Sequence, residues 1–201
     1  MAFRVVCISA VDGSGGEQVG PLVAEQLGYR LVNEEIVALA ARQAELAPAQ
    51  IADVERRKSL INRVLDRLGP TAVATSTMGA YVSPMVDDTP DEAALRDLIR
   101  AAIGQVAELG GVVIMAHAGS YALRARRDTL RVFLTASPEA RADRLSQDAK
   151  QLAKLDANRA DYLKRFYDIG AEQPHHYDVV LNTDHLEPSA AAGIIAGLTT
   201  A

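Results

Sequence analysis

The sequence has little cysteine and no long hydrophobic run, and each shortage excludes a class of protein. One cysteine, Cys7, stands among 201 residues, so neither an internal disulfide nor a cysteine-rich metal cluster can form. Cys7 lies in a short apolar run, where we expect a buried small side chain. No segment approaches the roughly 18 apolar residues of a membrane span, and no signal-peptide cleavage site follows the first apolar run. We therefore expect a cytoplasmic protein with no membrane partner.

Lysine is also scarce, and neither sign of charge dominates. The 21 basic residues comprise 17 arginines and 4 lysines, and the first lysine is Lys58. The formal net charge is −5, so the composition gives no support to nucleic-acid binding. The arginines nevertheless provide many planar donor groups that match phosphate oxygens.

What the sequence does contain is the pattern of one α/β domain covering residues 1–201. With 49% hydrophobic residues, the chain is long enough for one full core and short for two. Short apolar runs predict strands at residues 4–10, 30–32, 112–115, 130–134 and 177–182. Helical patterns cover residues 17–27, 34–46, 48–68, 90–109, 120–126, 156–167 and 188–198, and a further helix begins at Ser137. This alternation predicts a parallel sheet with helices on both faces.

Residues 70–90 do not follow the alternation. The segment is rich in small and hydroxyl-bearing residues and has no sustained period. It predicts a mobile loop or a weakly ordered cover, which would serve either as a lid or as the surface of a homodimer.

A cluster of glycines directly follows the first predicted strand and opens the first predicted helix. Residues 11–20 read VDGSGGEQVG. Glycines let several backbone N–H groups converge, and a helix N-terminus adds partial positive charge, so this position favours an anion site. The simpler alternative is that the glycines only allow a tight bend.

The loop departs from both common nucleotide-binding motifs. Gly15 and Gly20 have the outer spacing of G-x-x-x-x-G-K-[ST], but Pro21-Leu22 stand where that motif has Lys and Ser or Thr. The dinucleotide motif G-x-G-x-x-G, if begun at Gly13, would need glycine where the sequence has Gln18. A redox dinucleotide site is therefore not favoured.

Taken in order, several segments resemble the cytidylate kinase-like family of P-loop kinases. Residues 9–17, SAVDGSGGE, match the family's Ser-x-x-x-Gly-Ser-Gly-Gly-Arg loop except at the last position. Residues 130–145 are similar to its fourth strand and the start of its lid helix, and residues 177–183 to its last strand. Asp156, Arg159, Tyr162 and Tyr167 resemble its Asp-x-x-Arg-x-x-Tyr helix.

The resemblance implies a three-layer P-loop kinase fold with a five-stranded parallel sheet, and ATP with Mg²⁺ as cofactors. Nucleotides would be its partners. Residues 33–90 would form a helical acceptor arm and loop, and residues 137–170 lid-like helices. The donor nucleotide would contact Asp12, Gly13, Ser14, Gly15, Gly16, Glu17 and Gln18.

The sequence departs from the family pattern in three places, and two of these departures remove positive charge. Glu17 replaces the arginine after the loop glycines, and Ala116-His117 replace a Gly-Arg pair at the end of the third strand. A carboxylate beside a triphosphate is repulsive by about 1 kcal/mol at solvated distance. Asn33 replaces the usual aspartate after the second strand.

The remaining candidates for transition-state stabilisation are arginines. Arg141, Arg144 and Arg159 would clamp the transferring phosphoryl group, with a solvated helix face as the alternative. The acceptor would contact Asn33, His117 and Arg124.

Asp12 and His117 each allow two interpretations, whereas two neighbouring histidines give no metal site. Asp12 would hold a magnesium-bound water or cap the following helix, and His117 would be a site residue or a core histidine. No metal site of the protein's own is predicted, because His175 and His176 lack a third ligand at recognisable spacing.

These residues support three functions. The first is a nucleoside monophosphate kinase that moves the ATP γ-phosphoryl to CMP or a related acceptor. The second is a catalytically weak or inactive nucleotide-binding sensor or partner-binding protein, because the loop has lost positive charge. The third is a kinase for a different small hydroxylated acceptor.

Overall fold

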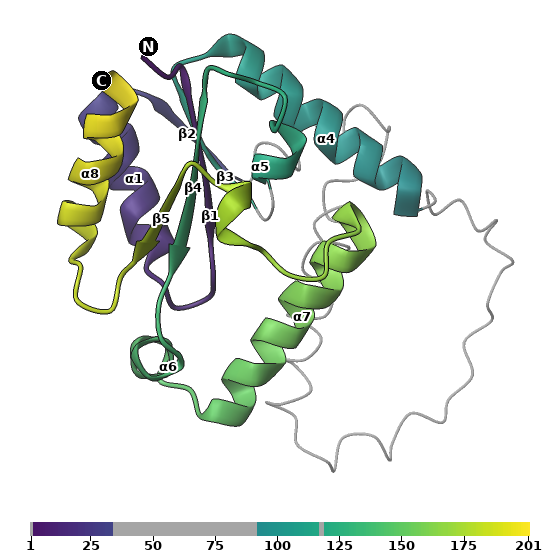
Figure 1. Cartoon of the computed structure of the whole chain (residues 1–201), viewed down its shortest axis with the longest axis vertical. Helices are drawn as coiled ribbons and strands as arrows, with labels where there is room; N and C mark the ends of the chain where they lie inside the picture. Colours follow the sequence, from purple (N-terminus) through teal and green to yellow (C-terminus); the bar gives the residue numbers. More distant parts are fainter. Residues whose placement is uncertain (1, 34–91, 117–118) are drawn as a thin grey trace, which may run out of the picture.

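A computed structural model describes residues 2–33, 92–116 and 119–201 of the chain. Within these residues it contains a parallel five-stranded sheet with strand order β2-β3-β1-β4-β5 (Figure 1). The strands are β1 (Val5–Ala10), β2 (Arg30–Val32), β3 (Val112–Met115), β4 (Thr129–Thr135) and β5 (Val179–Asn182). The first strand lies at the centre, so the loop that follows it opens at the middle of the sheet's carboxyl edge.

Helices cover both faces of the sheet, which gives the three layers (Figure 1). Two helices, α1 (Gly16–Leu27) and α8 (Pro188–Thr200), pack side by side on one face. The other face is covered by α4 (Glu92–Leu109), α5 (Gly119–Ala122) and the end of α7 (Ala149–Tyr167). The short helix α6 (Pro138–Leu145) follows β4, and a 3-10 turn, η2 (Pro174–His176), precedes β5.

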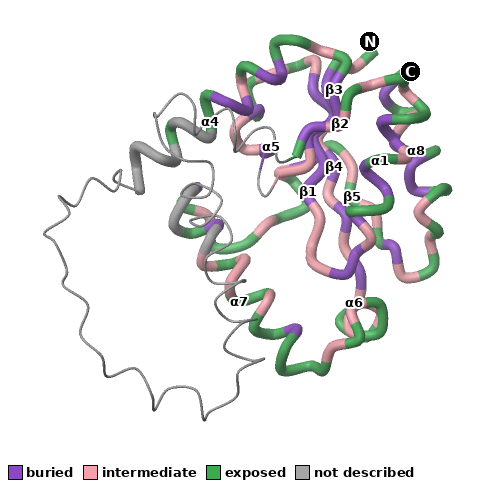
Figure 2. The backbone as a smooth tube through the Cα atoms, turned by 180° about the vertical axis from the view of Figure 1, so that it is seen from behind, coloured by how far each residue is buried: buried purple, intermediate pink, exposed green. Residues whose placement is uncertain are grey.

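The alternation of side chains along β1 builds two separate cores. Val5 and Cys7 point to the α4 side, whereas Val6 and Ile8 point to the α1 and α8 side. Figure 2 shows the strands as the most buried part of the backbone. Cys7 is a fully buried core residue, as predicted, and its burial raises the pKa of the thiol to about 12.

The predicted strands are confirmed, and the helices differ at their ends. The helix predicted over 120–126 ends at Ala122, and the chain then turns, with the Arg126 amide donating to the carbonyl of Leu123. The helix predicted from Asp156 begins at Ala149, because Asp148 and Gln151 form a capping box that sequence periodicity did not reveal. The helices predicted over 34–46 and 48–68, the loop 70–90 and His117 lie outside the described residues.

No helix in the described residues is both long enough and apolar enough to cross a membrane.

The packing of α8 gives a direct test of the core. Ile195 is fully buried against α1 and the sheet, whereas its neighbour Ile194 is 41% exposed. Replacing Ile195 with alanine should lower the free energy of unfolding by about 2–5 kcal/mol, because it removes apolar contact and leaves a cavity. The same change at Ile194 should alter it by about 0.5 kcal/mol or less. Urea unfolding of the two variants makes the comparison, and equal losses would contradict the register of α8.

Candidate functional site

The loop between β1 and α1 has a backbone that only glycine forms readily. Gly13 and Gly15 have φ of +79° and +81°, in the left-handed region that disfavours residues with a Cβ. Gly16 is required for a different reason, because a Cβ at this position would lie 2.5 Å from the Cβ of Ala10. The glycine cluster therefore allows both the turn and the close approach of α1 to β1.

This backbone leaves the start of α1 open to an anion. Gly15 caps the helix without any side-chain hydrogen bond, and among the described residues no partner is seen for the N–H groups of Gly16 and Glu17, whereas those of Gln18 and Val19 donate to the carbonyl of Gly15. The Ser14 hydroxyl is turned inward and donates to the carbonyl of Val11 at 2.7 Å. The alternative that Asp12 caps the helix is wrong. Converging N–H groups and the positive end of a helix suit phosphate oxygens.

The three arginines predicted to be catalytic all bind carbonyl groups at the start of this loop. Arg159 Nη1 donates to the oxygen of Ala10 at 2.8 Å, and Arg141 Nε to that of Asp12 at 2.7 Å. Arg144 Nη1 donates to the oxygen of Gly13 at 3.0 Å. The structure thus brings all three to the loop, on its carbonyl side.

Each arginine is also fixed by a second partner, which for Arg159 is the carboxylate of Glu172. The Arg141 guanidinium forms a two-pronged contact with the carboxylate of Asp156, and Arg144 binds the hydroxyl and carbonyl of Thr183. Arg141 is 5% exposed, so the alternative that it belongs to a solvated helix face is wrong. These contacts hold the loop's carbonyls on one side.

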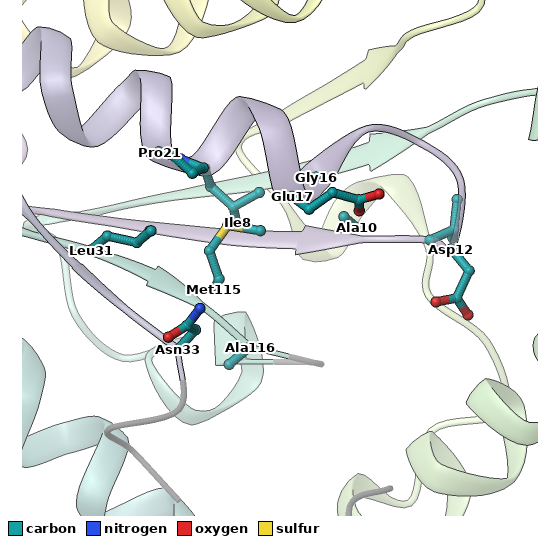
Figure 3. Close-up of a pocket in the computed structure, with 11 residues that line it drawn as sticks. Ile8, Ala10, Asp12, Gly16, Glu17, Pro21, Leu31, Asn33, Met115 and Ala116 are labelled. Carbon is teal, nitrogen blue, oxygen red and sulfur yellow. The ribbon is translucent and has the colours of Figure 1, made fainter. Parts of the chain in front are cut away.

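A pocket of about 280 Å³ lies beside the loop, at the carboxyl ends of three strands (Figure 3). It is lined by residues of β1, β2, β3, the loop and α1: Ile8, Ala10, Val11, Asp12, Gly16, Glu17, Pro21, Leu31, Asn33, Met115 and Ala116. Its floor is apolar. Ligands of parallel α/β sheets bind at this edge.

The polar groups of the pocket are acidic or neutral. Glu17 and Asn33 lie on opposite sides of Ile8 and Met115 in the view of Figure 3, and Asp12 lies at the loop end. No cationic side chain belongs to the described lining of this pocket. Glu17 directly follows the loop glycines, in the first turn of α1, and is exposed.

The other predicted site residues divide into two groups. Gly13, Ser14 and Gly15 form the turn itself, whereas Gln18 and Arg124 are exposed and do not line the pocket. His117 lies outside the described residues.

Sequence reasoning missed the residues that tie the loop to the far end of the chain. The Thr183 hydroxyl lies 3.0 Å from the carbonyl oxygen of Ser14, and Ser9 donates to Glu172 at 2.8 Å. Thr183 directly follows the last strand, and a hydroxyl at that carboxyl end was the available signal. Glu172 lies in an irregular segment, where nothing in the pattern pointed to it.

The family of this chain follows from a match to a family model. The model of the cytidylate kinase-like family matches residues 5–185. The chain belongs to the cytidylate kinase-like family. No curated protein matches the sequence.

Solved structures share the fold of this cytidylate kinase-like protein. An uncharacterized protein from Eubacterium ventriosum has a TM-score of 0.63 at 16% identity, with 97% of each chain covered. Shikimate kinase from Bacteroides thetaiotaomicron has a TM-score of 0.56 at 15% identity, with 98% of each chain covered. A gluconokinase from Sinorhizobium meliloti has a TM-score of 0.54 at 18% identity, covering 99% of this chain and 95% of its own. At these identities the likeness concerns the fold.

The turn of this cytidylate kinase-like loop can be tested at two glycines with the same backbone angle. A Cβ at Gly13 would lie 3.0 Å from the backbone oxygen of Arg141, whereas one at Gly15 would meet nothing within 4 Å. Gly15→Ala should destabilise the protein by about 1–2 kcal/mol because of its positive φ. Gly13→Ala should cost about 1–3 kcal/mol more, because the backbone of α6 cannot yield. Chemical denaturation measures both, and equal losses would show that the loop does not rest on α6.

Proposed function

We propose that this protein is a phosphotransferase that moves the γ-phosphoryl group of ATP to CMP or a related small acceptor. The observation that carries the proposal is the open backbone cradle at the start of α1, in a member of the cytidylate kinase-like family. Such a cradle binds phosphate through N–H groups and needs no side chain to do so. The pocket beside it would receive the acceptor. We expect this activity in the cytoplasm.

The donor side of the site fits a nucleotide phosphate better than it fits a metal. The loop N–H groups at Gly13, Gly15 and Gly16 would hold the phosphates. Asp12 is the residue that could hold a water of Mg²⁺, since the Ser14 hydroxyl is already bonded to Val11. ATP and Mg²⁺, when bound, would supply the phosphoryl group and the neutralisation of its charge.

A second function is favoured by the present use of the arginines. Arg141 and Arg159 are paired with carboxylates, and Arg144 with Thr183, so their charge is directed at the protein itself. Phosphoryl transfer depends on positive charge aimed at the transferring group. A nucleotide-binding protein with weak or no turnover, acting as a sensor or through a partner, is therefore the alternative.

The polar groups of the pocket bear on which acceptor it would receive. Two carboxylates and an amide, from Asp12, Glu17 and Asn33, suit hydroxyl groups better than a phosphate dianion. A small hydroxylated acceptor is accordingly assayed beside CMP.

Titration calorimetry with MgATP, and then with CMP and with ADP, tests the proposal together with a coupled assay of ADP release. ATP binding with turnover that depends on CMP is the expected result. Turnover with a polyol but not with CMP would support the hydroxylated acceptor. Binding without turnover would support the sensor, and no binding would overturn both nucleotide functions.

Replacing Glu17 with arginine should tighten MgATP binding by about tenfold, because a repulsive charge near the loop becomes an attractive one. The gain should shrink as salt is added, since the position is exposed. Titration calorimetry at two ionic strengths measures both effects.

Glu25→Arg is the matched control, because it makes the same change of charge at an exposed position near the far end of α1. An equal gain in the two variants would show that residue 17 does not face the nucleotide.

A further inference from the structure

A buried ion pair stands directly behind the start of the loop. Arg159 and Glu172 have side chains that are 8% and 4% exposed, and Arg159 Nε and Nη2 lie 2.7 and 2.6 Å from Glu172 Oε2. Glu172 belongs to the segment that runs from the end of α7 back to β5 (Figure 1). The sequence pattern gave no reason to expect a charge at this position.

The pair is connected to the loop through both of its members. Arg159 Nη1 donates to the carbonyl of Ala10 at 2.8 Å, and its Nη2 donates to the Ser9 hydroxyl at 2.9 Å. Ser9 in turn donates to Glu172 Oε1 at 2.8 Å, and the Tyr177 hydroxyl donates to the same oxygen. Both carboxylate oxygens of Glu172 are therefore used, and one bonded group joins α7, β1 and the approach to β5.

The two charged residues of this pair, Arg159 and Glu172, differ in what they contact. Arg159 makes the contact with the loop backbone, whereas Glu172 makes none with that backbone in the bonds described. Removing one partner of a buried ion pair is strongly destabilising, so the Glu172 carboxylate favours the buried position of the Arg159 guanidinium. Without the Glu172 carboxylate, Arg159 would lose the contacts of its Nε and Nη2 with that group and would hold the carbonyl of Ala10 less firmly.

We infer that Glu172 is a positioning residue for the phosphate loop, acting through Arg159 on Ser9 and Ala10. It holds the end of β1 in the place from which the loop's N–H groups converge. The inference rests on the proposed function for its effect on nucleotide binding, and on the fold alone for its effect on the loop.

The test replaces Glu172 with glutamine, which keeps the shape of the side chain and removes its charge. The MgATP dissociation constant should rise about tenfold, because small displacements of a binding loop weaken its contacts. Amide exchange measured by NMR without nucleotide should become faster at Val11 and Ser14, whose N–H groups bond to Leu134 and Val11. Glu172→Asp keeps the charge and should restore part of both properties.

Asp178→Asn is the matched control. It breaks another Arg–carboxylate pair, Arg131–Asp178, whose residues join β4 to the start of β5 and, within the described part of the chain, make no hydrogen bond with the loop. Burial of this pair is lower, with side chains 25% and 33% exposed, so both variants are compared at a temperature where each is fully folded. The control should leave exchange at Val11 and Ser14 unchanged.

The outcomes separate the inference from the proposed function. Wild-type exchange at Val11 and Ser14 in Glu172→Gln would overturn the inference, whether or not the protein binds nucleotide. Faster exchange there, in a protein whose wild type binds no MgATP, would support the inference and overturn the proposed function. An equal increase in amide exchange at Val11 and Ser14 in Asp178→Asn would show that Glu172 only stabilises the fold in general, and it would also overturn the inference.

Discussion

The site depends on the contact between three arginine side chains and the carbonyl groups of the loop after β1. A peptide that directs its N–H groups to one side must direct its carbonyls to the other, and those carbonyls need donors. Arg159, Arg141 and Arg144 supply them at Ala10, Asp12 and Gly13. Because Asp156 and Glu172 hold two of these arginines, the carboxylates shape the loop as well.

The position of these arginines behind the loop bears on the absence of a lysine from it. In a site whose cations face the ligand, the loss of one cation removes binding energy directly. Here positive charge stands behind the loop, and the open helix end faces the pocket. Phosphate affinity would then come mainly from oriented backbone groups. The carboxylate of Glu17 would lower this affinity without abolishing it, because its position is exposed. The same geometry leaves turnover as the property most at risk.

Local signals predicted the fold well, whereas they predicted the site only in part. Buried strands such as Val112–Met115 and the glycine loop follow from hydrophobic pattern and glycine spacing, which are properties of a few neighbouring residues. Direction of a side chain is not local. Arg141 and Arg144 were placed correctly at the start of a helix after β4, yet their partners, Asp156 and Thr183, are set by packing across the sheet edge. Glu172 carries no pattern at all, because its importance arises only from the arginine it meets.

The distance along the chain between the loop and its supports has a consequence for biosynthesis. The loop at residues 11–16 is made before the groups that bond to it, Arg141, Arg159 and Thr183, and the separations are 129 residues for Asp12–Arg141 and 169 for Ser14–Thr183. Contacts of such long range form late and slowly. On the ribosome, therefore, the loop would stay without these supporting contacts until Thr183 had emerged, and any nucleotide binding would begin as one of the last events of folding.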